Sequence, residues 1–356
     1  GSLEITKTVT GDRNWEQVKN TMSFKVTDES GVEIIGSPVA GTAFTETTPG
    51  SGIYHYVFNG LTAGKTYTVT EVLIGEDAAY ARTTTYTAAA SGTGETAVSA
   101  PISNATNVVV AFTNAYTKLQ GSLEITKTVT GDRNWEQVKN TMTFKVTDES
   151  GVEITGSPVA GTAFTETTPG SGIYHYVFNG LTAGKTYTVT EVLTGEDAAY
   201  ARTTTYTAAA SGTGETAVSA PISNAANVVV AFTNTYTKLQ GSLEITKTVT
   251  GDRNWEQVKS TMSFKVTDET GAEITGSPVA GTAFTETTPG SGIYHYVFNG
   301  LTAGKTYTVT EALTGEDVAY ARTTTYTAAA SGTGETAVSA PISNTANTVV
   351  AFTNAY

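Results

Sequence analysis

The 356-residue chain repeats itself with a period of 120 residues. The segment SLEITKTVTGD at residues 2–12 returns at 122–132 and again at 242–252, and the copies differ at few positions. A unit of this length can bury a core of its own, whereas solenoid repeats of roughly 20–50 residues need their neighbours to fold. The sequence therefore predicts three tandem domains, at residues 1–120, 121–240 and 241–356.

The composition and the turn pattern favour an all-β fold. Thr, Val, Tyr, Gly and Ala dominate, with 36 Gly and 18 Tyr in the chain. Each repeat contains roughly seven to nine short runs with strand alternation, separated by glycine-marked turns, which is typical of an immunoglobulin-like β-sandwich. Only residues 12–22 have a helical spacing. The connection at residues 117–120 is very short, so we expect three tandem immunoglobulin-like domains in an extended, semi-rigid rod.

The strands expected in the first repeat are the basis for the site prediction. Alternation or glycine-bounded apolar runs predict strands at 2–10, 23–27, 53–58, 66–73, 83–89, 97–102 and 108–116. A weak strand is expected within 32–49, which contains two prolines. The segment 91–95 is rich in glycine and is predicted to be a turn.

Charge and cysteine content exclude several classes of function. The net charge of −13 disfavours nucleic acids and anionic membranes as partners, because both bind basic surfaces. The chain has no cysteine, which excludes disulfides and thiolate metal sites, and we expect no metal or cofactor. No signal peptide, sorting signal or membrane-spanning stretch is visible. The chain stops four residues short of a third full unit, so we expect a fragment of a longer array. We also expect this fragment to fold as a monomer, without a partner.

Three strands in each repeat carry a polar residue on an otherwise apolar face. Alternation identifies Lys7 in the first strand, Glu71 in the strand at 66–73 and Asn114 in the last strand. An isolated polar group in a core costs several kcal/mol, so the three positions are best explained if they meet in space. The corresponding residues of the other copies are Lys127, Glu191, Asn234, Lys247, Glu311 and Asn354.

Two interpretations of these residues follow from the pattern. In the first, they form a buried, hydrogen-bonded Lys–Glu–Asn cluster or lie at strand ends that reach solvent; such buried ion pairs seldom add stability. In the second, desolvation favours the neutral amine of Lys7, which attacks the carboxamide of Asn114. A protonated Glu71 would then hydrogen-bond the amide oxygen and shuttle the proton that lets ammonia leave. The product is an isopeptide bond formed once in each domain, at the effective molarity that contact between the groups provides.

The sequence around these positions resembles a known family. The Lys in ITKTVTGD, the Glu in TYTVTE and the Asn in VAFTNAY resemble the B-type repeats of Gram-positive surface proteins, which occur in the collagen-binding adhesin and, as close relatives, in streptococcal pilin subunits. The resemblance covers the whole 120-residue unit three times. It implies an immunoglobulin-like sandwich whose adjacent first and last strands are joined by a Lys–Asn isopeptide bond, with Glu as catalyst. The implied cross-links are Lys7–Asn114, Lys127–Asn234 and Lys247–Asn354, and the implied catalytic residues are Glu71, Glu191 and Glu311.

The resemblance implies a structural function. We expect stalk or spacer repeats of a cell-wall-anchored adhesin outside the cell, whose bonds give mechanical, thermal and protease resistance. Other domains of the parent protein would bind host or cell-surface ligands. A ligand-binding adhesin module is an alternative, but the copies differ only by small changes scattered over turns. A pilus subunit is another alternative, but the Tyr-Pro-Lys pilin motif is missing, with Trp15-Glu16-Gln17-Val18-Lys19 a faint echo of its first half.

Other residues with chemical potential fit structural or surface roles. His55 is the only histidine of its repeat and has no partner at metal-ligand spacing. Lys65 lies in a glycine-flanked turn, and Asn104 and Asn107 precede the alternation of the last strand. No pocket with acid–base groups for an external substrate is visible. We therefore predict no enzyme activity beyond a single-turnover, autocatalytic bond formation.

Overall fold

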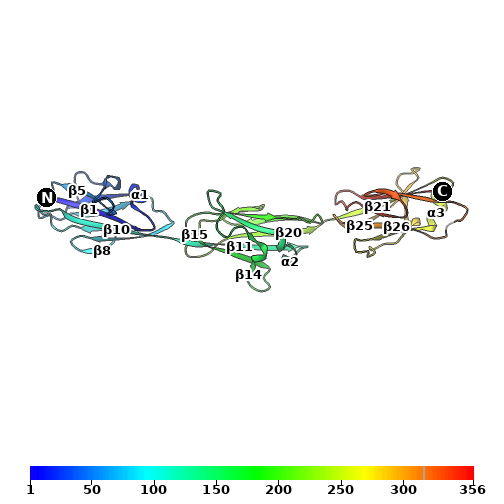
Figure 1. The fold of residues 1–356 in the computed structure, drawn as a ribbon, viewed down its shortest axis with the longest axis horizontal. Helices are drawn as coiled ribbons and strands as arrows, with labels where there is room; N and C mark the ends of the chain where they lie inside the picture. The colour runs from blue at the N-terminus through cyan, green and yellow to red at the C-terminus, as the bar shows by residue number, and fades with distance from the viewer. Residues whose placement is uncertain (316) are drawn as a thin grey trace.

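The computed structural model describes residues 1–315 and 317–356 and contains three β-sandwiches arranged in a line, with the chain termini at opposite ends (Figure 1). Each sandwich pairs a six-stranded sheet with a four-stranded sheet. In the first repeat the strand orders are β4-β5-β1-β10-β7-β8 and β3-β2-β6-β9. The predicted all-β fold with three tandem sandwich domains is therefore confirmed.

The elements have closely similar bounds in the three copies. The first repeat contains β1 (Ser2–Gly11), α1 (Trp15–Val18), η1 (Lys19–Thr21), β2 (Met22–Thr27), β3 (Val39–Ala40), η2 (Gly41–Ala43), β4 (Thr45–Glu46), β5 (Ile53–Asn59), β6 (Thr68–Leu73), β7 (Tyr80–Thr87), β8 (Ser91–Thr93), β9 (Thr96–Val98) and β10 (Val108–Lys118). The second contains β11 (Gln120–Gly131), α2 (Trp135–Val138), η3 (Lys139–Thr141), β12 (Met142–Thr147), β13 (Val159–Ala160), η4 (Gly161–Ala163), β14 (Thr165–Glu166), β15 (Ile173–Thr182), β16 (Thr188–Leu193), β17 (Tyr200–Thr207), β18 (Ser211–Thr213), β19 (Thr216–Val218) and β20 (Val228–Lys238). The third contains β21 (Gln240–Thr250), α3 (Trp255–Val258), η5 (Lys259–Thr261), β22 (Met262–Thr267), β23 (Val279–Ala280), η6 (Gly281–Ala283), β24 (Thr285–Glu286), β25 (Ile293–Thr302), β26 (Thr308–Leu313), β27 (Thr323–Thr327), β28 (Ser331–Thr333), β29 (Thr336–Val338) and β30 (Thr348–Ala355).

One predicted turn is a strand in the structure. The glycine-rich segment after β7 contains β8, which pairs with β7 through Thr85–Thr93, Tyr86–Gly92 and Thr87–Ser91. The Tyr86 ring lies against Gly92, where a Cβ atom would collide with it. Glycine composition alone therefore gave the wrong prediction, because this glycine accommodates a cross-strand aromatic ring and does not break the strand.

The first strand of each domain lies in the middle of the larger sheet. β1 pairs in parallel with the last strand, β10, and antiparallel with β5. Its alternating residues Leu3, Ile5 and Lys7 are fully buried between the two sheets. The first and last strands of the domain are therefore direct neighbours, so side chains at nearby positions on their inner faces can meet in the core.

The junction between the first two domains consists of a single residue between two strands. β10 ends at Lys118 and β11 begins at Gln120, so only Leu119 separates them. The Leu119 amide donates to the Ala79 carbonyl at 2.7 Å, and the Leu119 carbonyl accepts from the Ala183 amide at 3.0 Å. The backbone of this residue is therefore bonded to both domains. Leu239 makes the corresponding bonds to Ala199 and Ala303 in the second junction.

Small residues allow the neighbouring domains to approach closely at these junctions. Ala79 and Ala183 are buried, whereas Ala63, which corresponds to Ala183 in the first repeat, is exposed. Gly184 has φ +77°, and a Cβ atom at this position would lie 3.2 Å from the Cβ atom of Ala78. These contacts restrict bending at the junction and agree with the elongated arrangement in Figure 1.

Candidate functional site

The three polar residues singled out in the sequence meet in the core of each domain. Lys7 comes from β1 and Asn114 from β10, two neighbouring strands of the six-stranded sheet. Glu71 comes from β6 in the opposite sheet. Their exposed fractions are 0%, 0% and 2%. All three are thus core residues, and the interpretation as solvent-reaching strand ends is excluded for them.

One carboxylate bridges the amine and the amide. The Lys7 Nζ atom donates to Oε2 of Glu71 at 2.9 Å, and the Asn114 Nδ2 atom donates to Oε1 of Glu71 at 2.7 Å. The corresponding distances are 2.9 and 2.8 Å in the second domain and 2.8 and 2.7 Å in the third. The same Lys–Glu–Asn cluster is thus formed in all three domains, by Lys127, Glu191 and Asn234 and by Lys247, Glu311 and Asn354.

Aromatic side chains pack beside the buried cluster. The Lys7 Nζ atom lies 5.9 Å from the centroid of the Phe112 ring, and Phe24 packs beside Phe112 with ring centroids 5.8 Å apart. Burial lowers the pKa of the Lys7 ammonium from its ordinary value to about 8, although the charge of Glu71 opposes this shift. Lys127 and Lys247 have pKa values lowered to about 8 for the same reason. This environment favours the neutral, nucleophilic amine more strongly than water does.

The orientation of the amide differs from the one expected from the sequence. Glu71 was expected to hydrogen-bond the amide oxygen, but it accepts a hydrogen bond from the amide nitrogen of Asn114. The amide oxygen of Asn114 has no hydrogen-bond partner among the described residues, and Thr84 on β7 is the register partner of Asn114. In the second domain the equivalent hydroxyl, Thr204 Oγ1, donates to Asn234 Oδ1 at 2.8 Å. Glu71 therefore contacts the two nitrogen atoms of the cluster, and the oxygen faces a different group.

Comparison with known protein families assigns all three repeats to one family. Residues 3–117, 123–237 and 243–356 match the profile of a family described as Domain of unknown function (DUF5979). The chain belongs to the DUF5979 family. Each DUF5979 segment begins within the first strand of its sandwich and ends at or within one residue of the end of the last strand, so it contains one complete Lys–Glu–Asn cluster. No curated protein matches the chain.

Several solved structures are similar to the three DUF5979 repeats. The Bacillus anthracis TIE protein is 16% identical with a TM-score of 0.36, and the match covers 100% of this chain and 51% of that chain. This chain thus spans about half the length of the Bacillus anthracis protein. The major pilin from Streptococcus pyogenes is 17% identical with a TM-score of 0.28, covering 66% of this chain and 98% of that chain. Two B repeat units of the collagen binding protein of Staphylococcus aureus are 13% identical with a TM-score of 0.21, covering 100% and 99%.

Two residues beside the DUF5979 cluster were not identified from the sequence. Thr84 is 5% exposed, and its Oγ1 atom accepts a hydrogen bond from the Arg82 guanidinium. Both lie on β7, two positions apart. The alternation test that found Lys7 could have found them, since Arg82 and Thr84 share a strand face with Tyr86, which packs against Phe112.

The other candidates of the DUF5979 repeat lie outside the cluster. His55 Nδ1 is 2.6 Å from the Glu4 carboxylate on the outer side of the larger sheet. Lys65 forms an exposed ion pair with Glu29 at 2.9 Å. Asn104 and Asn107 are exposed. In the described part of the chain, no group of three or more His, Cys, Asp or Glu residues could hold a metal ion, and no helix has the length and apolar character to cross a membrane.

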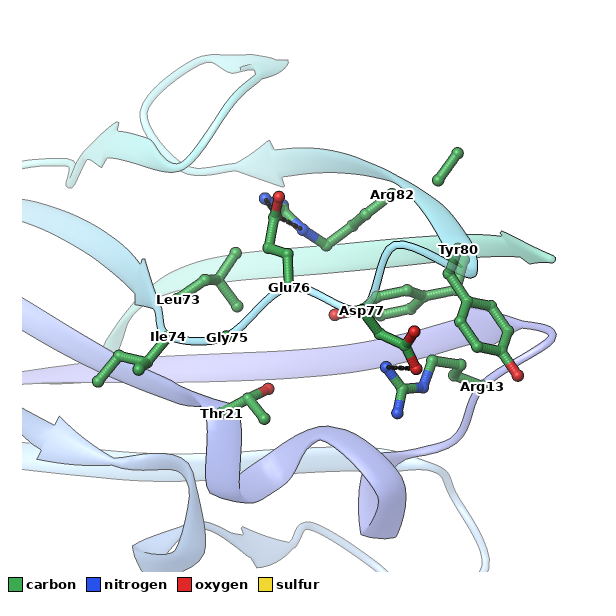
Figure 2. Close-up of a pocket in the computed structure, with 11 residues that line it drawn as sticks. Arg13, Thr21, Leu73, Ile74, Gly75, Glu76, Asp77, Tyr80 and Arg82 are labelled. Carbon is green, nitrogen blue, oxygen red and sulfur yellow. Dashed lines mark hydrogen bonds and ion pairs between the residues drawn. The ribbon is translucent and has the colours of Figure 1, made fainter. Parts of the chain in front are cut away.

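A surface cavity lined by Arg82 or its equivalent, Arg202 or Arg322, lies in each DUF5979 repeat. In the first repeat its volume is about 380 Å³, and Leu73, Arg82 and Tyr116 are among the residues that line it. Figure 2 shows Arg82 turned toward Glu76 and Arg13 turned toward Asp77, both in the loop that follows β6. The carboxylates neutralise both arginines, so the cavity has no free positive charge with which to bind an anion. Arg82 lines this cavity and also donates a hydrogen bond to the buried Thr84 hydroxyl.

Proposed function

We propose that the three DUF5979 repeats are stalk domains of a bacterial surface adhesin, each locked by an autocatalytic isopeptide bond between its first and last strands. The observation that carries this proposal is the buried contact of Lys7, Glu71 and Asn114, repeated in every domain. A buried ion pair alone adds little stability, because desolvation offsets the attraction. An amide bond between Lys7 and Asn114 removes the buried charge of the lysine, which the ion pair alone only partly offsets.

The chemistry that this cluster supports is an aminolysis of the Asn114 side chain by Lys7. The neutral Lys7 Nζ atom adds to the Cγ atom of Asn114 and gives a proton to the Glu71 carboxylate. Glu71 returns a proton to Nδ2, the C–N bond breaks, and ammonia leaves. The contacts of Glu71 with both nitrogen atoms match this shuttle. One bond forms per domain, and each cluster reacts once.

The position of the bond suits a domain that carries tension. Force enters each domain at the start of the first strand and leaves at the end of the last strand, and these two strands are parallel neighbours. A covalent link between Lys7 and Asn114 would carry the force directly from β1 to β10. The single-residue junctions then pass it to the next domain. This load path supports a location on the outer surface of a cell, where an adhesin stalk is under tension.

The intact mass of the purified chain tests the proposal. Each bond releases one ammonia, so the mass should be lower than the sequence value by about 17 Da per domain and about 51 Da in total. The Glu71→Ala variant should lack the bond of the first domain only and show a deficit of about 34 Da. An exposed control, Glu29→Ala, should keep the full deficit. An unshifted wild-type mass would contradict the proposal, and a full deficit in Glu71→Ala would remove Glu71 from its catalytic role.

A further inference from the structure

We propose that the Thr84 hydroxyl takes part in bond formation by donating a hydrogen bond to Oδ1 of Asn114 and stabilising the negative charge that develops there. This inference rests on the proposed isopeptide chemistry and extends it to residues of β7. The corresponding pairs are Thr204 with Asn234 and Thr324 with Asn354. In the second domain the equivalent hydroxyl, that of Thr204, contacts the amide group that reacts, so the threonine at this position is a candidate catalytic residue.

The register of the larger sheet places the hydroxyl beside the amide oxygen. Thr84 on β7 is the direct partner of Asn114 on β10, and both side chains are buried. In the second domain the Thr204 hydroxyl donates to Asn234 Oδ1 at 2.8 Å. This is the length of an ordinary O–H···O hydrogen bond, so the hydroxyl already lies beside the atom that gains negative charge in the reaction.

The amide oxygens of the other two domains accept no hydrogen bond from any described residue. Asn114 Oδ1 and Asn354 Oδ1 are buried and have no hydrogen-bond partner among the described residues. A buried carbonyl oxygen without a donor is costly, and its negative charge in a tetrahedral intermediate would be more costly still. The hydroxyl of the threonine that pairs with each of these asparagines can donate to the oxygen after a rotation about its χ1 angle.

The arginine on the same strand prepares the hydroxyl for this role. In all three domains the guanidinium donates to the threonine Oγ1 atom, from Arg82, Arg202 and Arg322. A hydroxyl has one donor and two acceptor positions, so accepting from the arginine leaves its O–H free for the amide oxygen. Arg82 is fixed by Glu76 at 2.8 Å and by Glu95 at 3.1 Å. Its positive charge polarises the Thr84 hydroxyl toward donation.

In the proposed reaction Glu71 acts on the nitrogen side of the Asn114 amide, and Thr84 acts on the oxygen side. Glu71 contacts the attacking and leaving nitrogen atoms and transfers the proton between them. Thr84 faces the oxygen, which gains charge when Lys7 adds to Cγ and loses it when ammonia leaves. No proton is taken from Thr84, so its action is electrostatic. Removing one such donor from an acyl-transfer site slows the reaction by about 10²–10³-fold.

The test uses the second domain, with the first and third domains of the same chain as internal controls. Wild type, Thr204→Val and Thr204→Ser are made by cell-free synthesis, and intact mass is followed over time. Wild type and Thr204→Ser should lose about 51 Da at the same rate, since serine keeps the hydroxyl. Thr204→Val should lose about 34 Da at that rate and the last 17 Da about 10²–10³-fold more slowly.

A folding measurement and a second variant distinguish a slower reaction from a failure of the domain to fold. Hydrogen exchange of the β20 amides reports whether the altered domain is folded, and Thr204→Ala is a second variant without a hydroxyl. If either folded variant forms its third bond at the wild-type rate, the inference is wrong. A wild-type chain without any mass loss would instead contradict the proposed function itself.

Discussion

Replacing the three cluster asparagines by alanine is expected to lower the melting temperature on the order of 15 °C. The variant combines Asn114→Ala, Asn234→Ala and Asn354→Ala and cannot form any isopeptide bond, but it keeps each buried Lys–Glu pair. A cross-link that closes a loop of roughly 100 residues contributes about 4–5 kcal/mol to the free energy of unfolding, by analogy with a disulfide. For domains of this size, 1 kcal/mol shifts the melting temperature by about 2–8 °C.

Scanning calorimetry of the full chain provides this comparison. The matched control replaces three exposed asparagines at equivalent positions, Asn59, Asn179 and Asn299, by alanine. It should melt within a few degrees of wild type, because surface substitutions usually change stability by less than about 0.5 kcal/mol. Equal melting temperatures for the cluster variant and the control would show that the asparagines do not provide a stabilising cross-link.

Under tension, wild-type domains are expected to resist extension that unbonded domains undergo. The proposed bond encloses roughly 100 residues, which would lengthen by about 35 nm if pulled straight at about 3.5 Å per residue. In wild type, force would bypass these residues through Lys7 and Asn114. Single-molecule pulling between the two chain ends should therefore show no step of this size below the force that breaks covalent bonds.

The triple asparagine variant should show three such steps, one for each domain. Its first and last strands are held only by hydrogen bonds, and these are loaded in shear because the strands are parallel and pulled from opposite ends. The exposed-asparagine control should behave like wild type. Steps of about 35 nm in wild type would mean that the force does not pass through a covalent link.

Much of the fold followed from local patterns in the sequence. The 120-residue period gave three tandem domains, and alternation gave the strands that carry Lys7, Glu71 and Asn114. The glycine-rich segment at β8 was mispredicted as a turn, since its structure depends on the Tyr86 ring of a neighbouring strand. The backbone hydrogen bonds of Leu119 with Ala79 and Ala183 could not be predicted from local sequence patterns either, because they join segments far apart in the chain.

The members of the cluster could be predicted because each breaks the apolar pattern of its own strand. Their contacts could not be derived from alternation, because the pairing register and the packing of the two sheets decide which atoms meet. The orientation of the Asn114 amide is an example. In the second domain its equivalent accepts a hydrogen bond from Thr204, whereas the sequence marks Thr84 only as a residue of the strand predicted at 83–89. A register between β7 and β10 was needed to see this residue as part of the site.

Peptide mapping after trypsin digestion is the most direct test of the central claim, the Lys–Asn bond in each domain. A lysine whose amine is in an amide is not cleaved, so three branched peptides are expected. They join residues 1–13 to 83–118, residues 119–133 to 203–238, and residues 239–253 to 323–356, each about 17 Da lighter than the sum of its parts. Fragmentation should place the links at Lys7 and Asn114 and at their equivalents. Recovery of the linear peptides instead, with cleavage after Lys7, Lys127 and Lys247, would contradict the account.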